Sequence, residues 1–289
     1  MPVSHNGNRV VGLVGIGLLG SALAERLIGA RFEILGYDES DQAQSRFEVT
    51  GGHVASGLKE LVAACRRIVL CLPDSVVVER VLTEIRPYLS PATIIIDTTT
   101  GDPEHTKHVA ESLSGINVEL IDATVLGSSE VTRRGQAVLM VGATPAAFDQ
   151  CRPVLEAISG NIHYLGRTGS GQEMKLVANL VLGLNRAVLA EGLHFARSLG
   201  FDLNAVLSIL KSGSAWSRVM DDKGQKMIRE EFEPQARLSQ HLKDVRLILS
   251  RAEDGGTKLP LSEVHHNLLQ RVEDAGDGDL DNSAVIRAW

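Results

Sequence analysis

The stretch that decides the fold reads Val10-Val-Gly-Leu-Val-Gly15-Ile16-Gly17-Leu18-Leu19-Gly20-Ser-Ala-Leu-Ala24. An apolar run typical of a strand enters a G-x-G-x-x-G turn, and a helical pattern leaves it. In such turns the first glycine permits the tight bend, the second lets the backbone approach a pyrophosphate, and the third lets helix and strand pack closely. The helix N-terminus then offers free N–H groups and a partial positive charge. Because the turn lies within a βαβ unit, we expect residues 15–20 to bind a dinucleotide.

Short apolar runs and helical patterns alternate after this turn. The runs expected to be buried strands are Arg9–Val14, Glu33–Tyr37, Arg67–Leu72, Thr93–Asp97, Val118–Asp122, Ala137–Gly142 and Ile162–Leu165. The helices expected between them are Leu18–Gly29, Asp41–Thr50, Leu58–Ala64, Asp74–Tyr88 and Pro145–Ile158. This order predicts an α/β fold with right-handed crossovers and a doubly wound parallel sheet, the Rossmann arrangement.

The pattern changes near residue 166. Gly166-Arg-Thr-Gly169-Ser-Gly171 is a glycine-rich turn, and a single helical pattern follows over residues 172–199. The remainder is helix-like and shows no strand pattern. We therefore expect a Rossmann NAD-binding domain at residues 1–165. An all-α domain for substrate binding and dimerisation is expected at residues 166–289, beginning with the long interdomain helix.

Composition excludes several classes of protein. Of the 289 residues, 44% are hydrophobic and 22% charged, which excludes a disordered or collagen-like chain. The net charge of −7 gives no basic footprint for nucleic acid. Three cysteines do not make a disulfide framework, so a reducing compartment is expected.

Two segments bear on localisation. The first eight residues are polar and cannot form a signal-peptide core. The apolar stretch 176–193 is interrupted by Asn179, Asn185, Arg186 and Glu191, which makes it too polar for a membrane span. We expect a soluble, cytoplasmic protein that acts on a small molecule and binds neither nucleic acid nor membrane.

An acidic residue ends the second expected strand. Asp38 lies 18 residues after Gly20, where a carboxylate accepts hydrogen bonds from the ribose hydroxyls of NAD. It would repel the 2′-phosphate of NADP, Glu39 adds to this repulsion, and no arginine follows within the turn. The sequence therefore favours NAD over NADP. The alternative is that Asp38 only caps the next helix.

Lys175 and Asn179 have i, i+4 spacing on the long helix and share a face. Hydride transfer to a carbonyl leaves an alkoxide that needs a proton, and a lysine shielded from water can serve as that acid or as the base in reverse. Taken alone, such a pair is also compatible with an ordinary exposed lysine. The histidine pairs His105/His108 and His265/His266 lack partners at metal-ligand spacing, so no metal site is expected.

Six ordered elements make the chain resemble the β-hydroxyacid dehydrogenases, which include 3-hydroxyisobutyrate dehydrogenase and tartronate semialdehyde reductase and have the fold of 6-phosphogluconate dehydrogenase. They are the turn at Gly15–Gly20, Cys71-Leu72-Pro73, Asp97-Thr-Thr-Thr100-Gly-Asp-Pro103, the glycine loop with Lys175 and Asn179, Lys243-Asp244, and the ending Gly276-Asp-Gly-Asp-Leu-Asp281-Asn-Ser283. The resemblance implies that Leu72, Pro73, Thr100 and Lys243 bind the cofactor. It also implies that Lys175 is the general acid/base, that Asn179 holds the substrate and the lysine, and that Asp244, beside Lys243, belongs to the substrate-binding residues.

The chain departs from this family at the turn that binds the substrate carboxylate. The family has Asp-Ala-Pro-Val-Ser-Gly-Gly, whereas this chain has Asp122-Ala-Thr124-Val-Leu126-Gly127-Ser128. Three interpretations remain open. Backbone N–H groups could hold the carboxylate, with a hydroxyl from Ser128 or Ser129; the substrate could carry a less polar group against Leu126; or the site could be inactive or repurposed.

The sequence thus predicts an oxidoreductase that transfers hydride between NAD(H) and a short β-hydroxy acid or its semialdehyde. One alternative is an imine reductase or another carbonyl reductase whose substrate has no carboxylate. Leu126 favours this alternative and Lys175 argues against it. The other is a non-catalytic NAD-binding sensor, which would need neither Lys175 nor Asn179. The apolar long helix and the resemblance both predict a homodimer or homotetramer.

Overall fold

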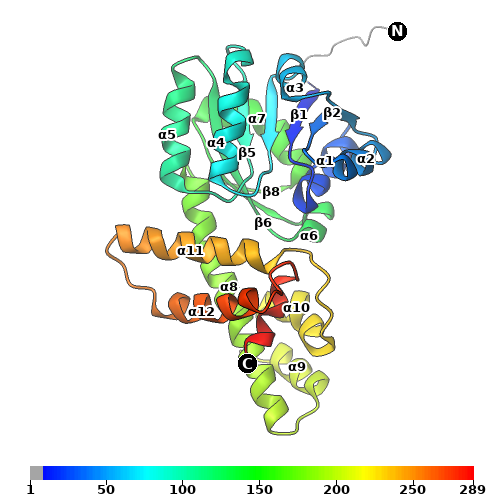
Figure 1. The fold of residues 1–289 in the computed structure, drawn as a ribbon, viewed down its shortest axis with the longest axis vertical. Coiled ribbons are helices and arrows are strands. Elements are labelled where there is room, and N and C mark those ends of the chain that lie inside the picture. Colours follow the sequence, from blue (N-terminus) through cyan, green and yellow to red (C-terminus); the bar gives the residue numbers. More distant parts are fainter. Residues whose placement is uncertain (1–8) are drawn as a thin grey trace. The chain divides into compact units, whose positions relative to one another are not determined.

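The computed structural model describes residues 9–289 (Figure 1). The absence of a signal-peptide core was predicted for the first eight residues, which lie outside this range. The chain forms two compact units, one ending at Lys175 and the other comprising Leu176–Trp289. The sequence placed the boundary at residue 165, whereas the first unit also includes the glycine-rich turn and the start of the long helix.

The first unit is built on one sheet with the strand order β3-β2-β1-β4-β5-β6-β7-β8. The strands are β1 Val10–Val14, β2 Glu33–Tyr37, β3 His53–Val54, β4 Arg67–Leu70, β5 Ile94–Asp97, β6 Glu119–Leu126, β7 Val138–Gly142 and β8 Asn161–Tyr164. Every pair is parallel except β6 with β7. The strand order reverses beside β1, which pairs with both β2 and β4, so the carboxyl end of β1 is a topological switch point.

Helices cover both faces of this sheet (Figure 1). They are α1 Leu18–Gly29, α2 Asp41–Val49, α3 Leu58–Ala64, α4 Ser75–Ile85, the short η1 Arg86–Tyr88, α5 Pro103–Ser114, α6 Ser129–Arg133 and α7 Pro145–Ile158. One core cluster joins the sheet to α1 and α7, through residues such as Leu23 and Val154. A second cluster joins the sheet to α3 and α4, through residues such as Leu61 and Leu82. The central strands β1, β4, β5, β6 and β7 are therefore buried on both sides, which confirms the doubly wound fold. The expectation of a buried strand at Ile162–Leu165 was wrong, because β8 lies at the edge of the sheet and is largely exposed.

The prediction was wrong in detail around β6. The sequence predicted a strand ending at Asp122 followed by a turn, but β6 continues to Leu126 and pairs antiparallel with β7. The apolar residues Ala123 and Val125 explain the extension, because both are buried in the core that α1 and α7 cover. The helices α5 and α6 and the two-residue strand β3 were not predicted.

The second unit is helical. Its helices are the remainder of α8 Ser170–Ser198, α9 Leu203–Ser212, α10 Arg218–Arg229, α11 Leu238–Asp254, α12 Pro260–Asp274 and η2 Asn282–Ala288. A core that includes Leu193, Met227 and Leu269 holds them together. At about 1.5 Å per residue, α8 is about 43 Å long. The sequence predicted a stretch too polar for a membrane span, but α8 is long and apolar enough to cross a membrane by length and composition alone. Of its most apolar window, 44% is buried in protein.

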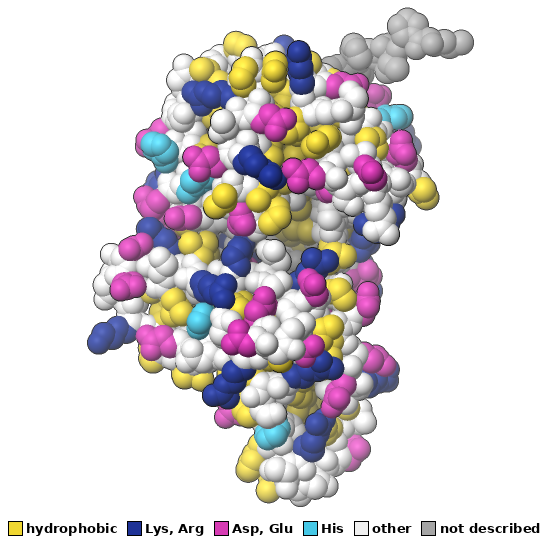
Figure 2. Space-filling model, in the orientation of Figure 1, with side chains coloured by type: hydrophobic (Ala, Val, Ile, Leu, Met, Phe, Trp, Pro, Cys, Tyr) yellow, Lys and Arg dark blue, Asp and Glu magenta, His cyan; other side chains and the backbone are white. Residues whose placement is uncertain are grey.

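Acidic and basic side chains are interspersed over the face shown in Figure 2.

The three cysteines, Cys65, Cys71 and Cys151, are free thiols, and burial raises the pKa of each to about 12. Within residues 9–289, no three His, Cys, Asp or Glu side chains gather as a metal site would require.

Candidate active site

The glycine-rich turn between β1 and α1 has the shape of a phosphate cradle. Gly15 has φ +93°, and a side chain there would overlap the carbonyl oxygen of Cys71. A side chain at Gly20 would overlap the carbonyl oxygen of Gly15. A Cβ built on Gly17, in contrast, meets no atom within 4 Å, and no described side chain caps α1. The turn therefore leaves open space in front of the uncapped helix N-terminus, where a pyrophosphate fits.

Asp38 joins the end of β2 to this turn. Its Oδ2 accepts a hydrogen bond of 2.7 Å from the N–H of Ile16, and its Oδ1 accepts one of 2.9 Å from Ser40. The N-cap of α2 is Ser40, whose hydroxyl accepts from Ala43. Asp38 is thus not merely a helix cap, and its carboxylate lies next to the phosphate cradle.

Sequence reasoning missed a basic residue that pairs with Glu39, the neighbour of Asp38. Arg80 on α4 forms an ion pair of 3.0 Å with Glu39. Both side chains are largely exposed. No arginine follows Asp38 within its own turn, but α4 brings one to the same edge of the sheet.

The ends of β4 and β5 place the Leu-Pro element beside the threonine loop. The hydroxyl of Thr99 accepts a hydrogen bond of 3.1 Å from the N–H of Leu72. The hydroxyl of Thr98 donates to the carbonyl oxygen of Leu70 at 2.6 Å. Leu72, Pro73 and Thr100 therefore lie at the carboxyl edge of the sheet, as does the phosphate cradle.

Lys175 is buried at the carboxyl end of β6. Its side chain is 8% exposed, and its Nζ donates to the carbonyl oxygen of Val125 at 2.6 Å. One turn later on α8, Asn179 is also buried and donates from Nδ2 to Oδ2 of Asp244 at 2.8 Å. Asp244 therefore fixes the orientation of the Asn179 amide. Lys243, its neighbour on α11, forms an ion pair with the same carboxylate at 3.0 Å.

The end of β6 and the turn after it contain the residues that were expected to bind the substrate carboxylate. Thr124 is fully buried, and its hydroxyl donates to the carbonyl oxygen of Gly171 at 2.9 Å, so it supports the start of α8. Leu126 is half-buried at the end of β6. Gly127 has φ +151°, and the hydroxyl of Ser128 accepts from the N–H of Val131 as the cap of α6.

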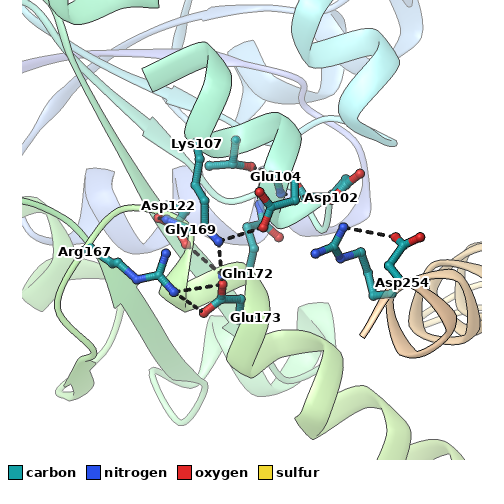
Figure 3. A network of polar contacts seen from close by, with 11 residues as sticks. Asp102, Glu104, Lys107, Asp122, Arg167, Gly169, Gln172, Glu173 and Asp254 are labelled. Atoms are coloured by element: carbon teal, nitrogen blue, oxygen red, sulfur yellow. Dashed lines mark hydrogen bonds and ion pairs between the residues drawn. The ribbon is translucent and has the colours of Figure 1, made fainter. Parts of the chain in front are cut away.

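Asp122 is a buried residue that the sequence did not single out as functional. Its carboxylate accepts hydrogen bonds from the N–H of Gly169 at 2.6 Å and of Gln172 at 2.8 Å (Figure 3). Burial raises the pKa of Asp122 to about 6, although these hydrogen bonds oppose the rise. The carboxylate thus anchors the glycine-rich loop that precedes Lys175.

An ion-pair cluster covers the outer side of the same helix start (Figure 3). Lys107 on α5 lies between Glu104 and Glu173, at 2.8 and 2.7 Å. Arg167 approaches Glu173 at 3.3 Å. Only the pair Glu104 and Lys107 has a sequence signal, its i,i+3 spacing, whereas the contacts with Glu173 join separate segments.

Two family models match almost the whole described chain. Residues 10–166 match the NAD-binding domain of 6-phosphogluconate dehydrogenase, and residues 169–289 match the NAD-binding domain of NADP-dependent 3-hydroxyisobutyrate dehydrogenase. The chain belongs to the β-hydroxyacid dehydrogenase family. The resemblance inferred from the six sequence elements is confirmed.

Named relatives agree with this family. The chain is 28% identical to 2-(hydroxymethyl)glutarate dehydrogenase of Eubacterium barkeri, over 96% of this chain and 94% of that protein. It is 28% identical to 2-hydroxy-3-oxopropionate reductase of Escherichia coli K12, over 96% of each. A crystal structure of 3-hydroxyisobutyrate dehydrogenase from Salmonella typhimurium has the same fold, with a TM-score of 0.90 at 24% identity over 97% of this chain and 99% of that one. This β-hydroxyacid dehydrogenase is therefore an oxidoreductase with NAD(P)-binding domains.

Proposed function

We propose that this β-hydroxyacid dehydrogenase interconverts a short β-hydroxy acid and its semialdehyde, with NAD as cofactor and Lys175 as general acid/base. The observation that carries the proposal is the burial of the Lys175 ammonium beside the carbonyl oxygen of Val125, at 2.6 Å. An exposed structural lysine would lie in water, whereas this one is held at the carboxyl edge of the sheet, where ligands of open α/β sheets bind.

A bound nicotinamide dinucleotide supplies hydride transfer to and from the carbonyl carbon, and the chain supplies the rest. In reduction, Lys175 gives a proton from Nζ to the substrate oxygen; in oxidation, it takes the hydroxyl proton. The carbonyl of Val125 orients the ammonium. Because Asp244 engages the Nδ2 of Asn179, the amide Oδ1 of Asn179 is directed away from that carboxylate and can accept from the lysine or the substrate hydroxyl. We include Leu72, Pro73, Thr100 and Lys243 among the cofactor-binding residues on the family resemblance.

The carboxylate turn supports a specific version of the substrate proposal. Because Leu126 has no hydroxyl, we assign the substrate carboxylate to backbone N–H groups at Gly127 and Ser128 and to the Ser128 hydroxyl. That hydroxyl accepts from Val131, so its own proton can still be donated. The half-buried Leu126 favours a second candidate, a carbonyl or imine without a carboxylate. The buried Lys175 argues against an imine substrate, because imine reductases usually lack a lysine at this position.

The proposal of NAD rests on Asp38 and Glu39. The Asp38 carboxylate lies 2.7 Å from the N–H of Ile16, at the edge of the phosphate cradle, where a 2′-phosphate would meet a negative charge. Arg80 pairs with Glu39 and leaves the Asp38 carboxylate in place, and both side chains of the pair are exposed to water, which screens the charge. We expect Arg80→Ala to leave the preference for NAD unchanged.

The proposal extends to assembly and localisation. Several large apolar side chains of the helical unit are exposed: Val177, Val181, Val188, Phe195, Phe201 and Ile209. A second copy of the chain would cover such a surface in a homodimer or homotetramer. We propose a cytoplasmic protein that uses a small-molecule substrate and needs no metal, nucleic acid or membrane.

The test compares wild type with Lys175→Met. NADH formation is measured with 3-hydroxyisobutyrate, glycerate, 4-hydroxybutyrate, serine and threonate, with NAD and NADP in parallel, and NADH binding is measured by fluorescence. We expect one acid to be oxidised with NAD, and the variant to lose turnover by at least about 10³-fold while binding NADH normally. Unchanged turnover in the variant would overturn the role of Lys175. Silence of the wild type across the panel, with NADH bound, would overturn the carboxylate substrate and favour the second candidate.

A further inference from the structure

Gln172 is a fully buried polar residue one turn before Lys175, and the proposed chemistry does not use it. Its side-chain Nε2 donates to the carbonyl oxygen of Thr99 at 2.8 Å. Its Oε1 accepts from the N–H of Gly101 at 2.9 Å. Both polar atoms of the amide are therefore engaged by the two backbone neighbours of Thr100.

The backbone of Gln172 is held as well. Its N–H donates to Oδ2 of Asp122 at 2.8 Å, and this carboxylate also accepts from Gly169 (Figure 3). The residue is thus fixed to β6 by its main chain and to the loop after β5 by its side chain. The buried side chain and main chain of Gln172 therefore link the two segments through hydrogen bonds.

The loop on the far side of the amide has little freedom. A side chain at Gly101 would overlap the hydroxyl of Ser75, which also accepts from the N–H of Asp102 at 2.8 Å. The hydroxyl of Thr99 holds the N–H of Leu72 at 3.1 Å. The two side-chain hydrogen bonds of Gln172 tie this loop to α8.

We propose that Gln172 is a positioning residue that sets the distance between the cofactor loop at Thr100 and the acid/base Lys175. The proposal rests on the proposed function, because it assigns Thr100 to the nicotinamide side and Lys175 to proton transfer. Hydride and proton must reach neighbouring atoms of one carbonyl group, so the two segments have to be in register. A misplacement of about 1 Å in such a site can cost about 10²-fold in rate.

The test uses the full-length chain with two variants. Gln172→Met keeps the length and volume of the side chain and removes both hydrogen bonds to the loop. The matched control is Glu173→Gln, on the same turn of α8, which loses its ion pairs with Lys107 and Arg167 on the solvent side. Two measurements are made: steady-state kinetics with the panel acid that the wild type oxidises fastest, and amide hydrogen exchange with and without NADH.

We expect Gln172→Met to lower kcat about 10- to 100-fold, with the KM for NAD within about threefold of wild type. The primary isotope effect on kcat, measured with substrate deuterated at the reacting carbon, should increase because hydride transfer becomes the slow step. Glu173→Gln should change none of these. A kcat of Gln172→Met within twofold of wild type would overturn the proposal. So would a decrease in kcat that is fully explained by a decrease in the fraction of the variant that binds NADH.

Hydrogen exchange tests whether Gln172 couples the loop at Thr100 to the start of α8, even if the protein shows no turnover. In wild type, NADH should slow exchange in residues 99–103 and also in residues 170–175, because Gln172 joins the two segments. In Gln172→Met the effect on residues 170–175 should disappear, while the control retains it. Persistence of that effect in Gln172→Met would overturn the inference. If the wild type bound NADH but oxidised no panel acid, the substrate proposal alone would fail, and this comparison would still decide the role of Gln172.

Discussion

Gly17 allows the fold and the ligand-binding role of the phosphate cradle to be separated. Its φ of −71° is accessible to any residue, and a methyl group built there meets no atom within 4 Å. We therefore expect Gly17→Ala to fold normally. Its free energy of unfolding should be unchanged or higher by about 0.4–1 kcal/mol, because alanine restricts the unfolded chain.

The same methyl group occupies the space in front of the N-terminus of α1. It should keep a pyrophosphate from reaching the uncapped N–H groups, and each lost hydrogen bond to a charged group is worth about 1.5–3 kcal/mol. We expect the Kd for NADH to rise about 10- to 100-fold, which corresponds to about 1.4–2.8 kcal/mol. The assay is a fluorescence titration with NADH, paired with urea unfolding of the same preparation.

Two other glycines provide the controls. Gly29, at the other end of α1, also has open space around a built Cβ, so Gly29→Ala should leave the affinity for NADH unchanged and should keep or raise stability, as Gly17→Ala does. In Gly20→Ala the methyl would overlap the carbonyl oxygen of Gly15, and stability itself should fall. An unaltered Kd in Gly17→Ala would refute the placement of the phosphates over this turn.

Three further predictions concern charge and polarity. Because burial raises the pKa of Asp122 to about 6, its ionised form costs stability as pH rises from about 4 to about 6. As pH falls below about 6, one oxygen of the carboxyl becomes protonated and one of its two hydrogen bonds to the start of α8 is weakened, so kcat should decline. Asp122→Asn should remove this limb of the kcat–pH profile. Burial also favours a raised pKa for Asp281, but the Lys223 ammonium at 2.9 Å outweighs it and holds the pKa at about 2, so Asp281→Asn should destabilise the protein by about 3–5 kcal/mol at pH 7 in thermal unfolding. Since the pKa is depressed in the folded state, that advantage of wild type should persist above pH 4 and shrink as pH falls towards 2. Leu126→Ser should raise kcat/KM for the preferred hydroxy acid about tenfold relative to butanol, and equal changes for both substrates would contradict a carboxylate at this turn.

The fold was predictable because its signals are local. The glycine turn, the buried apolar runs and the helix starts each depend on neighbouring residues, and α1, α3 and α7 have the predicted bounds. The antiparallel pairing of β6 with β7 was not predictable in this way. Its cause is the burial of Ala123 and Val125 against elements distant in the chain, which a turn-like sequence does not reveal.

The residues of the candidate site were likewise predictable only where the signal is local. Lys175 and Asn179 share one helix, so their spacing shows that they share a face. Gln172 forms hydrogen bonds with backbone atoms of Gly101 and Thr99, which lie 71 and 73 positions earlier in the chain. Because these partners are backbone atoms, the side chains of Gly101 and Thr99 give no indication of the contact. Arg80 likewise reaches Glu39 only because α4 passes the end of β2. The substrate-binding role of Thr124 stays a prediction, and the sequence did not reveal that its hydroxyl donates to the carbonyl oxygen of Gly171, 47 residues away.

The two edges of the sheet bear on how copies of the chain can associate. One edge is β3, which has two residues, and the other is β8, which has four and carries an Asn161–His163 side-chain contact of 3.1 Å. Short, polar edge strands are poor templates for pairing with a strand of another molecule. The sheet is therefore closed to growth by strand addition, and an assembly of several copies has to be built from helix surfaces.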